Sequence, residues 1–312
     1  MPHFDITIAG EINLDLILYG LPPELPLEHE LLASGLEITL GSSSAITAHN
    51  LAALGSKVGF ITRVGEDPLG ALALDRLRAV GVDLSRTTHS TESKTGLTVL
   101  LTHGGSRHLL TYPGCMAEMS REHLNLDYLK SARHFHLSSY FLHRALLPHI
   151  VDVIQNLKDA GLTISLDTND DPADQWNDGI AEILPYVDVL MPNEREACKL
   201  AVTEDFAAAI RKLVREVPLL VVKRGAQGAT AYTEEKEVSV KAIPVRIVDA
   251  IGAGDTFNAG FLHKWTQGRP LAECLTYGNL AAACSTTKPG GTEAFRDPGY
   301  WKSFFASHSQ QG

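Results

Sequence analysis

The sequence has no long apolar run, no surplus of basic residues and few cysteines. No stretch of its 312 residues approaches the apolar length needed to span a bilayer, so we expect no membrane partner. The formal net charge of −10 argues against a nucleic acid partner, because nucleic acids select for clustered lysine and arginine. The four cysteines lack metal-ligand or redox spacing, and the first residues carry no secretion signal. These absences together indicate a cytoplasmic protein with reduced thiols.

The order of apolar patterns along the chain predicts an α/β fold. Hydrophobic residues make up 44% of the chain and charged residues 21%, which suffices for a sizeable core. From residue 133 onward, strand-like runs alternate with helical patterns, as in a parallel sheet covered by helices on both faces. Two earlier stretches, about 11–40 and 90–112, carry extra strands, and Gly104-Gly105 is typical of a hairpin turn. We interpret these strands as a lid over the sheet, within one unit that spans residues 1–312.

The lid also predicts association between copies of the chain. A small sheet with one apolar face is often completed by a second copy of itself, so we expect a homodimer formed through the lid. Individual elements predicted from the same patterns are strands at 4–9, 31–40, 58–64 and 245–248, and helices at 45–54, 68–80 and 146–160.

The stretch from Val248 to Phe261 carries the clearest chemical signal. The residues Gly252–Gly254 lack bulk and are followed at once by a helical pattern, so their N–H groups can approach an anion closely. Asp255 lies in the first turn of that helix. A carboxylate beside bound phosphate is repelled, so its presence there indicates a functional role. Proton abstraction from a hydroxyl is such a role, although an aspartate in a first turn also serves as a simple partner of the helix dipole. The segment therefore predicts an anion hole with a general base.

A second signal lies near the N-terminus. Asn13 and Asp15 are two residues apart on an extended segment, so their side chains share one face. An amide and a carboxylate on one face can grip vicinal hydroxyls of a sugar, one donating and one accepting. The alternative is a strand end with solvated polar residues.

Together, these segments resemble the ribokinase-like carbohydrate kinases of the PfkB family, whose signature is Asp-Thr-x-Gly-Ala-Gly-Asp; Ala250 replaces the usual threonine here. The resemblance covers nearly the whole chain. It implies a three-layer sandwich with a mostly parallel central sheet, helices on both faces and a small β-sheet lid. It also implies an ATP- and Mg²⁺-dependent sugar kinase in which Asp255 is the base and Gly252, Ala253 and Gly254 form the anion hole.

The sugar site implied by the resemblance departs from the family pattern at two positions, and the first is Ser42, which replaces a glycine. Gly41 and Ala45 match the family, but Ile46 stands where a sugar-contacting asparagine is common, and Asn50 is one turn later. We expect Asn50 to compensate, while a helix N-cap role for 42–44 is the alternative. The implied substrate-binding residues are Asn13, Asp15, Gly41, Ser42, Ser43, Asn50 and Asp255.

The nucleotide and metal sites also follow from the resemblance. Asn193 and Glu196 match a motif that organises Mg²⁺ and its waters, although a capping box would look identical. A monovalent cation such as K⁺ is implied near Asp249 and Ile251. The implied ATP-binding residues are Asn193, Lys223, Gly225, Gly252, Gly254 and Asn279.

Asp171 bears on the substrate. It occupies the position of an arginine in family members that bind acid sugars, so we predict a neutral sugar, unless Asp171 belongs to an acidic loop that caps a helix. A nucleoside kinase of the same fold is an alternative function, with Tyr112, Tyr140 and Phe141 as a possible base slot. A non-catalytic regulator that binds sugar or nucleotide is a second alternative.

Overall fold

A computed structural model describes residues 2–103 and 106–308, so the predicted turn at Gly104-Gly105 lies outside the described residues. Its main sheet has eight strands in the order β14-β13-β12-β11-β10-β9-β1-β4. Six are parallel, and β13 and β14 form an antiparallel hairpin at one edge. The strands are β1 (Phe4–Ala9), β4 (Val58–Ile61), β9 (Ala132–Ser138), β10 (Thr163–Asp167), β11 (Val189–Leu190), β12 (Leu219–Lys223), β13 (Ala229–Tyr232) and β14 (Glu237–Val240).

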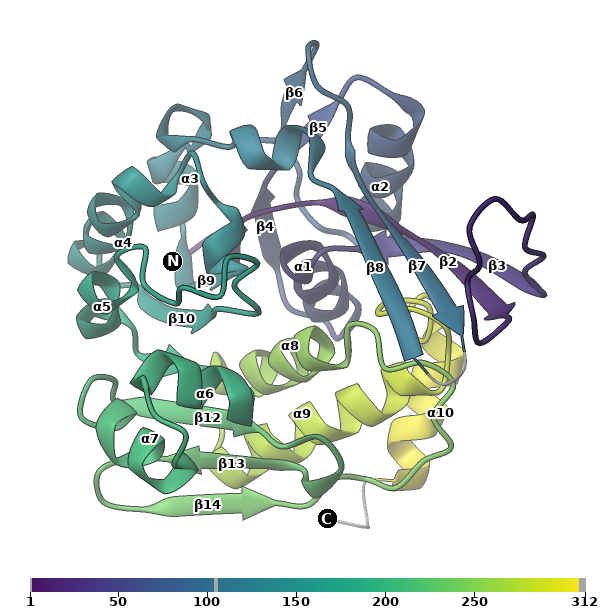
Figure 1. Cartoon of the computed structure of the whole chain (residues 1–312). Coiled ribbons are helices and arrows are strands. Elements are labelled where there is room, and N and C mark those ends of the chain that lie inside the picture. Colours follow the sequence, from purple (N-terminus) through teal and green to yellow (C-terminus); the bar gives the residue numbers. More distant parts are fainter. Residues whose placement is uncertain (1, 104–105, 309–312) are drawn as a thin grey trace.

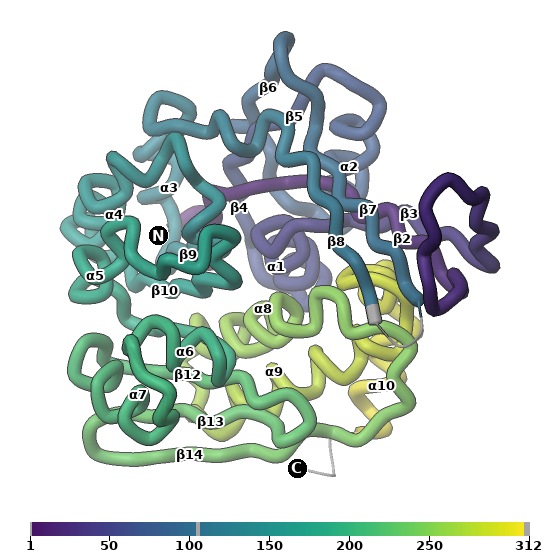
Figure 2. Tube along the Cα trace, viewed as in Figure 1, coloured from purple at the N-terminus to yellow at the C-terminus, as the bar shows by residue number. Residues whose placement is uncertain are grey.

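Helices cover both faces of this sheet, which confirms the predicted three-layer arrangement (Figures 1 and 2). Two apolar clusters fill the space between the layers, because side chains from alternate strand positions enter opposite faces. One cluster lies under α3 (Leu126–Lys130), α4 (Ile150–Asp159), α5 (Ile180–Ile183), α6 (Glu194–Ala201) and α7 (Phe206–Leu213). The other lies under α1 (Ser43–Ala53), α2 (Pro68–Ala79), α8 (Ala253–Trp265) and α9 (Leu271–Thr286), and α10 (Pro298–His308) packs on α9.

A separate four-stranded sheet, in the order β3-β2-β7-β8, extends from the edge of the body (Figure 1). We call this sheet the lid; its strands are β2 (Asn13–Leu21), β3 (Gly35–Gly41), β7 (Gly96–His103) and β8 (Ser106–Tyr112). They come from the two stretches in which extra strands were predicted. A further short pair, β5 (Arg63–Gly65) and β6 (Thr88–Ser90), forms its own sheet.

Several predicted elements differ from those observed. The strand predicted at 31–40 begins only at Gly35, and the one predicted at 58–64 divides into β4 and β5, which join different sheets. The helix predicted from 146 begins at Ile150, because Pro148 sits in a short 3₁₀ turn before it. The strand predicted at 245–248 is wrong: within the described residues this segment pairs with no strand, and the hairpin β13–β14 forms that edge of the sheet.

The described residues contain no helix long and apolar enough to cross a membrane.

Candidate active site

Two cavities meet at the turn that precedes α8. The first, of about 690 Å³, lies between the lid, the start of α1 and the 169–172 loop, and we call it the lid cavity. The second, of about 730 Å³, lies between α9, the turn at Gly225 and the segment 241–247, and we call it the α9 cavity. Ala250 lines both of them. A ligand in one cavity therefore reaches the same turn as a ligand in the other.

Asp255 lies in the first turn of α8 and lines the lid cavity, with only 9% of its surface exposed. Burial raises the pKa of Asp255 to about 7, with a further contribution from the charge of Asp167 and opposition from Lys223. The Ser43 hydroxyl lowers the pKa of this carboxyl group and so also opposes the shift. A carboxylate with a pKa near 7 is matched to proton abstraction at neutral pH.

The turn in front of Asp255 requires glycine. Gly252 caps α8 with φ of 67°, and a Cβ there would lie 2.7 Å from the Cα of Gly291. The side of Gly254 is open, and a Cβ there would lie 3.6 Å from the Nζ of Lys223. Backbone N–H groups at a helix N-terminus and a nearby ammonium group together suit a phosphate.

Lys223 is positioned by a residue whose role the sequence analysis missed. Its Nζ donates to the carboxylate of Asp167, which is fully buried and also accepts a hydrogen bond from Asn258. Burial opposes the charge of Lys223, but the neighbouring carboxylates of Asp167 and Glu196 raise its pKa overall. The sequence signal was the aspartate at the end of a buried strand, where open α/β sheets bind their ligands.

Asn13 and Asp15 face the lid cavity side by side. A Cβ at Gly41, on the neighbouring strand, would collide with both side chains, so this position requires glycine. The Asn13 Nδ2 donates to Thr98 at 2.8 Å, whereas its Oδ1 is buried without a partner among the described residues. Burial raises the pKa of Asp15 to about 7, helped by the charges of Asp255 and Asp249 and opposed by Arg107. An unpaired acceptor beside a carboxyl group suits a ligand with several hydroxyls.

A second missed residue, Glu11, anchors the start of α1 to this cavity. Its carboxylate accepts from the Ser44 hydroxyl at 2.6 Å and pairs with buried His143 at 3.3 Å. Burial alone would raise the pKa of Glu11, but His143 and the hydroxyls of Ser44 and Ser139 lower it to about 2. The Ser42 hydroxyl donates to the Glu11 carbonyl at 2.7 Å, which fixes the entry into the helix. The lid cavity thus contains Glu11, which is ionised at neutral pH, together with Asp15 and Asp255, whose pKa values are raised to about 7.

Five of the predicted residues are not among those that line the lid cavity. Asn50 is fully buried inside the protein and cannot compensate for Ile46 by contacting a sugar, so that prediction is wrong. The carboxylate of Asp171 accepts hydrogen bonds from three backbone N–H groups of its own loop, so the structure supports the loop interpretation rather than a charge aimed at the substrate. The residues proposed as a base slot also lie elsewhere, since Tyr140 and Phe141 belong to the core and Tyr112 is exposed outside the cavity.

Glu196 lines the lid cavity from the start of α6, and Asn193 caps that helix. Both oxygens of Glu196 accept hydrogen bonds from Asn193, at 2.6 and 2.8 Å, which confirms the capping box. Burial raises the pKa of Glu196 to about 7, while the charge of Lys223 opposes the shift. A buried carboxylate with lone pairs facing a cavity fits a Mg²⁺ ion held through water.

The carboxylate of Asp249 fits a metal ion less well. It accepts hydrogen bonds from the backbone of Ile251 at 2.9 Å, from the backbone of Gly290 at 3.1 Å and from Tyr19 of the lid at 3.1 Å. These donors leave one lone-pair direction of the carboxylate, on Oδ1, for a monovalent cation. We therefore derive no step through K⁺.

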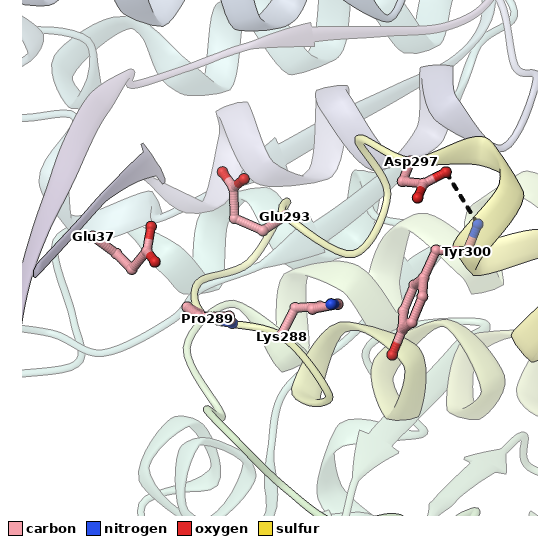
Figure 3. Close-up of a pocket in the computed structure, with 6 residues that line it drawn as sticks. All are labelled: Glu37, Lys288, Pro289, Glu293, Asp297 and Tyr300. Carbon is pink, nitrogen blue, oxygen red and sulfur yellow. Dashed lines mark hydrogen bonds between the residues drawn. The ribbon is translucent and has the colours of Figure 1, made fainter. Parts of the chain in front are cut away.

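Gly290 belongs to a loop, 287–297, that faces the lid across a small pocket (Figure 3). Figure 3 shows Glu37 of the lid on one side and Lys288 and Glu293 of the loop on the other. Glu293 accepts from Thr39 of the lid at 3.1 Å and pairs with Arg76 at 2.5 Å. The loop therefore joins the lid to the body of the protein.

The α9 cavity has mostly apolar walls, formed by residues such as Ile243, Val245 and Phe257, and its polar end lies at Gly254 and Lys223. This shape suits a flat aromatic base with phosphates at one end. Gly225 and Asn279, both predicted to bind ATP, line this cavity. The amide of Asn279 donates to the carbonyls of Val240 and Lys241, so its donors support the cavity wall.

Comparison with known proteins gives one consistent result. The family model for pfkB family carbohydrate kinases matches residues 4–297. An ATP-dependent ribose-1-phosphate kinase from Halopiger xanaduensis is 29% identical, with 93% of this chain and 94% of that protein covered. A cytidine kinase from Thermococcus kodakarensis is 27% identical, over 88% and 93% of the two chains. A structure described as a ribokinase II from E. coli, in complex with ATP and Mg²⁺, has a TM-score of 0.87 and 25% identity, and the match covers 98% of this chain and all of that one.

Proposed function

Since the chain belongs to the pfkB family of carbohydrate kinases, we propose that it transfers the γ-phosphate of ATP to a hydroxymethyl group of a sugar, with Asp255 as general base. One observation carries the proposal. The buried carboxyl of Asp255, with a pKa of about 7, lies beside a glycine turn at which two cavities meet. The sugar would occupy the lid cavity and ATP the α9 cavity, so that the two reactants meet at the turn.

The proposed reaction is a direct in-line transfer. Asp255 takes the proton of the attacking hydroxyl as its oxygen bonds to the γ-phosphorus, while the bridging P–O bond to the β-phosphate breaks and ADP leaves. Negative charge develops on the oxygens of the transferred phosphoryl group and on the departing ADP. The N–H groups of Ala253 and Gly254 and the ammonium of Lys223 stabilise that charge without having to reorganise. Mg²⁺, held through water near Glu196, would neutralise charge on the ATP phosphates.

The charge of the substrate is proposed from Arg107. This residue of β8 is the one basic side chain among the described residues that line the lid cavity. Within the described residues its charge acts on Asp15, but no hydrogen bond or ion pair holds its side chain. Asp171, which had suggested a neutral sugar, faces its own loop. We therefore propose a sugar whose reacting end lies at Asp255 and whose other end carries a carboxylate or phosphate near Arg107.

An ADP-release screen tests this function and the substrate charge together. We expect ADP formation with a carboxylated or phosphorylated sugar, and weaker activity with neutral pentoses and hexoses. Replacing Arg107 by Gln should raise KM for the acidic substrate about 10- to 100-fold, as for the loss of a charge-assisted hydrogen bond, and change KM for neutral sugars less than about twofold.

The other outcomes of the screen are informative as well. Equal losses for acidic and neutral sugars would refute the role of Arg107. Nucleosides belong in the screen, because Leu100, Leu109, Met116 and Leu142 give the lid cavity an apolar side that a base could contact. A protein that binds ATP but releases no ADP with any of these compounds would be a regulator, and the kinase proposal would fail.

We also propose a homodimer formed through the lid. On the face of the lid away from the cavity, Leu16 pairs with Ile38 and Val99, and Val99 pairs with Leu110, which is 58% exposed. Such a continuous apolar face is costly in water unless it is covered. Light scattering at micromolar concentration should give twice the 33.8 kDa of one chain.

Leu110→Asp should convert the dimer to a monomer, because the new charge would be buried at the interface. Val202→Asp is the control, since Val202, the C-cap residue of α6, is an exposed apolar residue outside the lid. A wild-type protein that is monomeric under these conditions would rule out the lid dimer.

A further inference from the structure

Asn50 holds the turn at Gly252 from inside the protein. It is fully buried on α1 and lines neither cavity. Its Nδ2 donates to the hydroxyl of Thr256 at 2.9 Å and to the carbonyl of Gly291 at 3.0 Å. Its Oδ1 is engaged by the Nδ1 of His49 at 2.8 Å. An amide with every group paired in a dry environment fixes the elements that it joins, here α1, α8 and the 287–297 loop.

Thr256 carries this constraint to the turn itself. Its hydroxyl lies 2.7 Å from the carbonyl of Gly252 and 3.2 Å from that of Gly291, and its backbone N–H donates to the Gly252 carbonyl at 2.9 Å. The carbonyl of Gly252 is therefore held from α8, while the amide of Asn50 holds Thr256. The direction of the following N–H groups, on Ala253 and Gly254, depends on the orientation of this peptide.

Ile46 closes the other side of the turn. It lies one helical turn before Asn50, so the two side chains share a face of α1. The Cδ1 of Ile46 lies 3.0 Å from where a Cβ of Gly252 would be and 2.8 Å from where a Cβ of Gly291 would be. The backbones of the turn and of the loop thus pack closely between the apolar side chain of Ile46 and the buried hydrogen bonds of Asn50.

We propose that Asn50 is a positioning residue, which fixes the anion hole through Thr256 and Gly291 so that its N–H groups are aimed before phosphate arrives. This inference rests on the proposed role of Gly252–Gly254 in phosphoryl transfer. The family pattern expects an asparagine that contacts the sugar at position 46, where this chain has Ile46. The asparagine one turn later, Asn50, would instead position the groups that bind the phosphate. Preorganised donors accelerate a reaction because they need not reorganise as charge develops, and small misplacements are costly.

The test compares turnover with binding in Asn50→Ala. We expect kcat to fall about 10²-fold, as for a misaligned catalytic group, while KM for the sugar and Kd for ATP change less than about twofold. Thr256→Val should reproduce the loss, and Thr256→Ser, which keeps the hydroxyl, should remain near wild type. This pair gives the same test if Asn50→Ala does not fold. Asn125→Ala is the control, because it removes the N-cap of α3 and lowers stability at a distance from both cavities.

A second measurement separates this inference from the proposed function. MgADP with aluminium fluoride mimics the transferred phosphoryl group, and wild-type enzyme with the best sugar from the screen should bind it more tightly than MgADP alone. Asn50→Ala should lose that difference. If wild type shows no difference, the anion hole itself is refuted, and this inference with it. If wild type shows it and Asn50→Ala keeps both the difference and the wild-type kcat, losing only thermal stability, Asn50 is a structural residue and the inference alone is wrong.

Discussion

Asp255→Asn should lower turnover about 10²- to 10⁴-fold, which is the range expected for loss of a general base. The substitution keeps the size and most hydrogen bonds of the side chain but cannot accept the proton of the attacking hydroxyl. It also removes a buried negative charge, whose burial raises the pKa of Asp255 to about 7. We therefore expect a stable protein whose Kd for ATP, measured by calorimetry, is within about twofold of wild type.

The pH dependence supplies the control for this variant. The base must be ionised to act, so kcat/KM of the wild type should fall as the pH drops below about 7, the pKa of Asp255, and be full above it. Asp15 and Glu196 also have pKa values raised to about 7 and contribute to the same range. The residual kcat/KM of Asp255→Asn should lack the part of this pH dependence that comes from the ionisation of Asp255. Turnover near the wild-type level in this variant would show that another group takes the proton.

Lys223→Met should damage both stability and turnover. The methionine has a similar length but leaves the fully buried carboxylate of Asp167 with Asn258 as its remaining side-chain donor. Breaking a buried ion pair in this way typically costs about 3–5 kcal/mol of unfolding free energy. Loss of the positive charge near Gly254 should also lower kcat about 10²- to 10³-fold, as when one donor to a developing anion is removed.

The double variant Lys223→Met with Asp167→Asn separates the two effects. It removes the unpaired charge, so the free energy of unfolding, measured with denaturant, should return most of the way to the wild-type value. Replacing both members of a buried ion pair is often nearly neutral. Turnover should stay low if Lys223 contacts phosphate. A double variant as active as wild type would mean that Lys223 serves only to neutralise Asp167.

The sequence predicted the layers of the fold better than its edges. Alternating strand and helix patterns are local, and they led to the parallel sheet and the helices on both faces. The hairpin β13–β14 and the unpaired segment 245–248 were not predicted, because which strand pairs at an edge depends on distant residues.

The site shows the same division. Asp255, Asn13 and Asp15 line one cavity, since each lies on a regular element with a fixed direction, and their roles in binding and catalysis stay predictions. The partners of these residues were not predicted. Glu11 and Asp167 acquire their importance from contacts with His143 and Lys223, which are more than 50 residues away in the chain. Asn50 had the correct residue type for binding a sugar, but the direction of its side chain is set by tertiary packing.

A crystal structure of Asp255→Asn with ATP, Mg²⁺ and the sugar from the screen would test the central claim most directly. We predict that the hydroxymethyl oxygen lies within about 3 Å of the side chain at position 255, in line with the γ-phosphorus. The γ-phosphate oxygens should accept hydrogen bonds from the backbone N–H groups of Ala253 and Gly254. A sugar bound with every hydroxyl more than about 5 Å from position 255, beyond the hydrogen-bond range, would contradict the account.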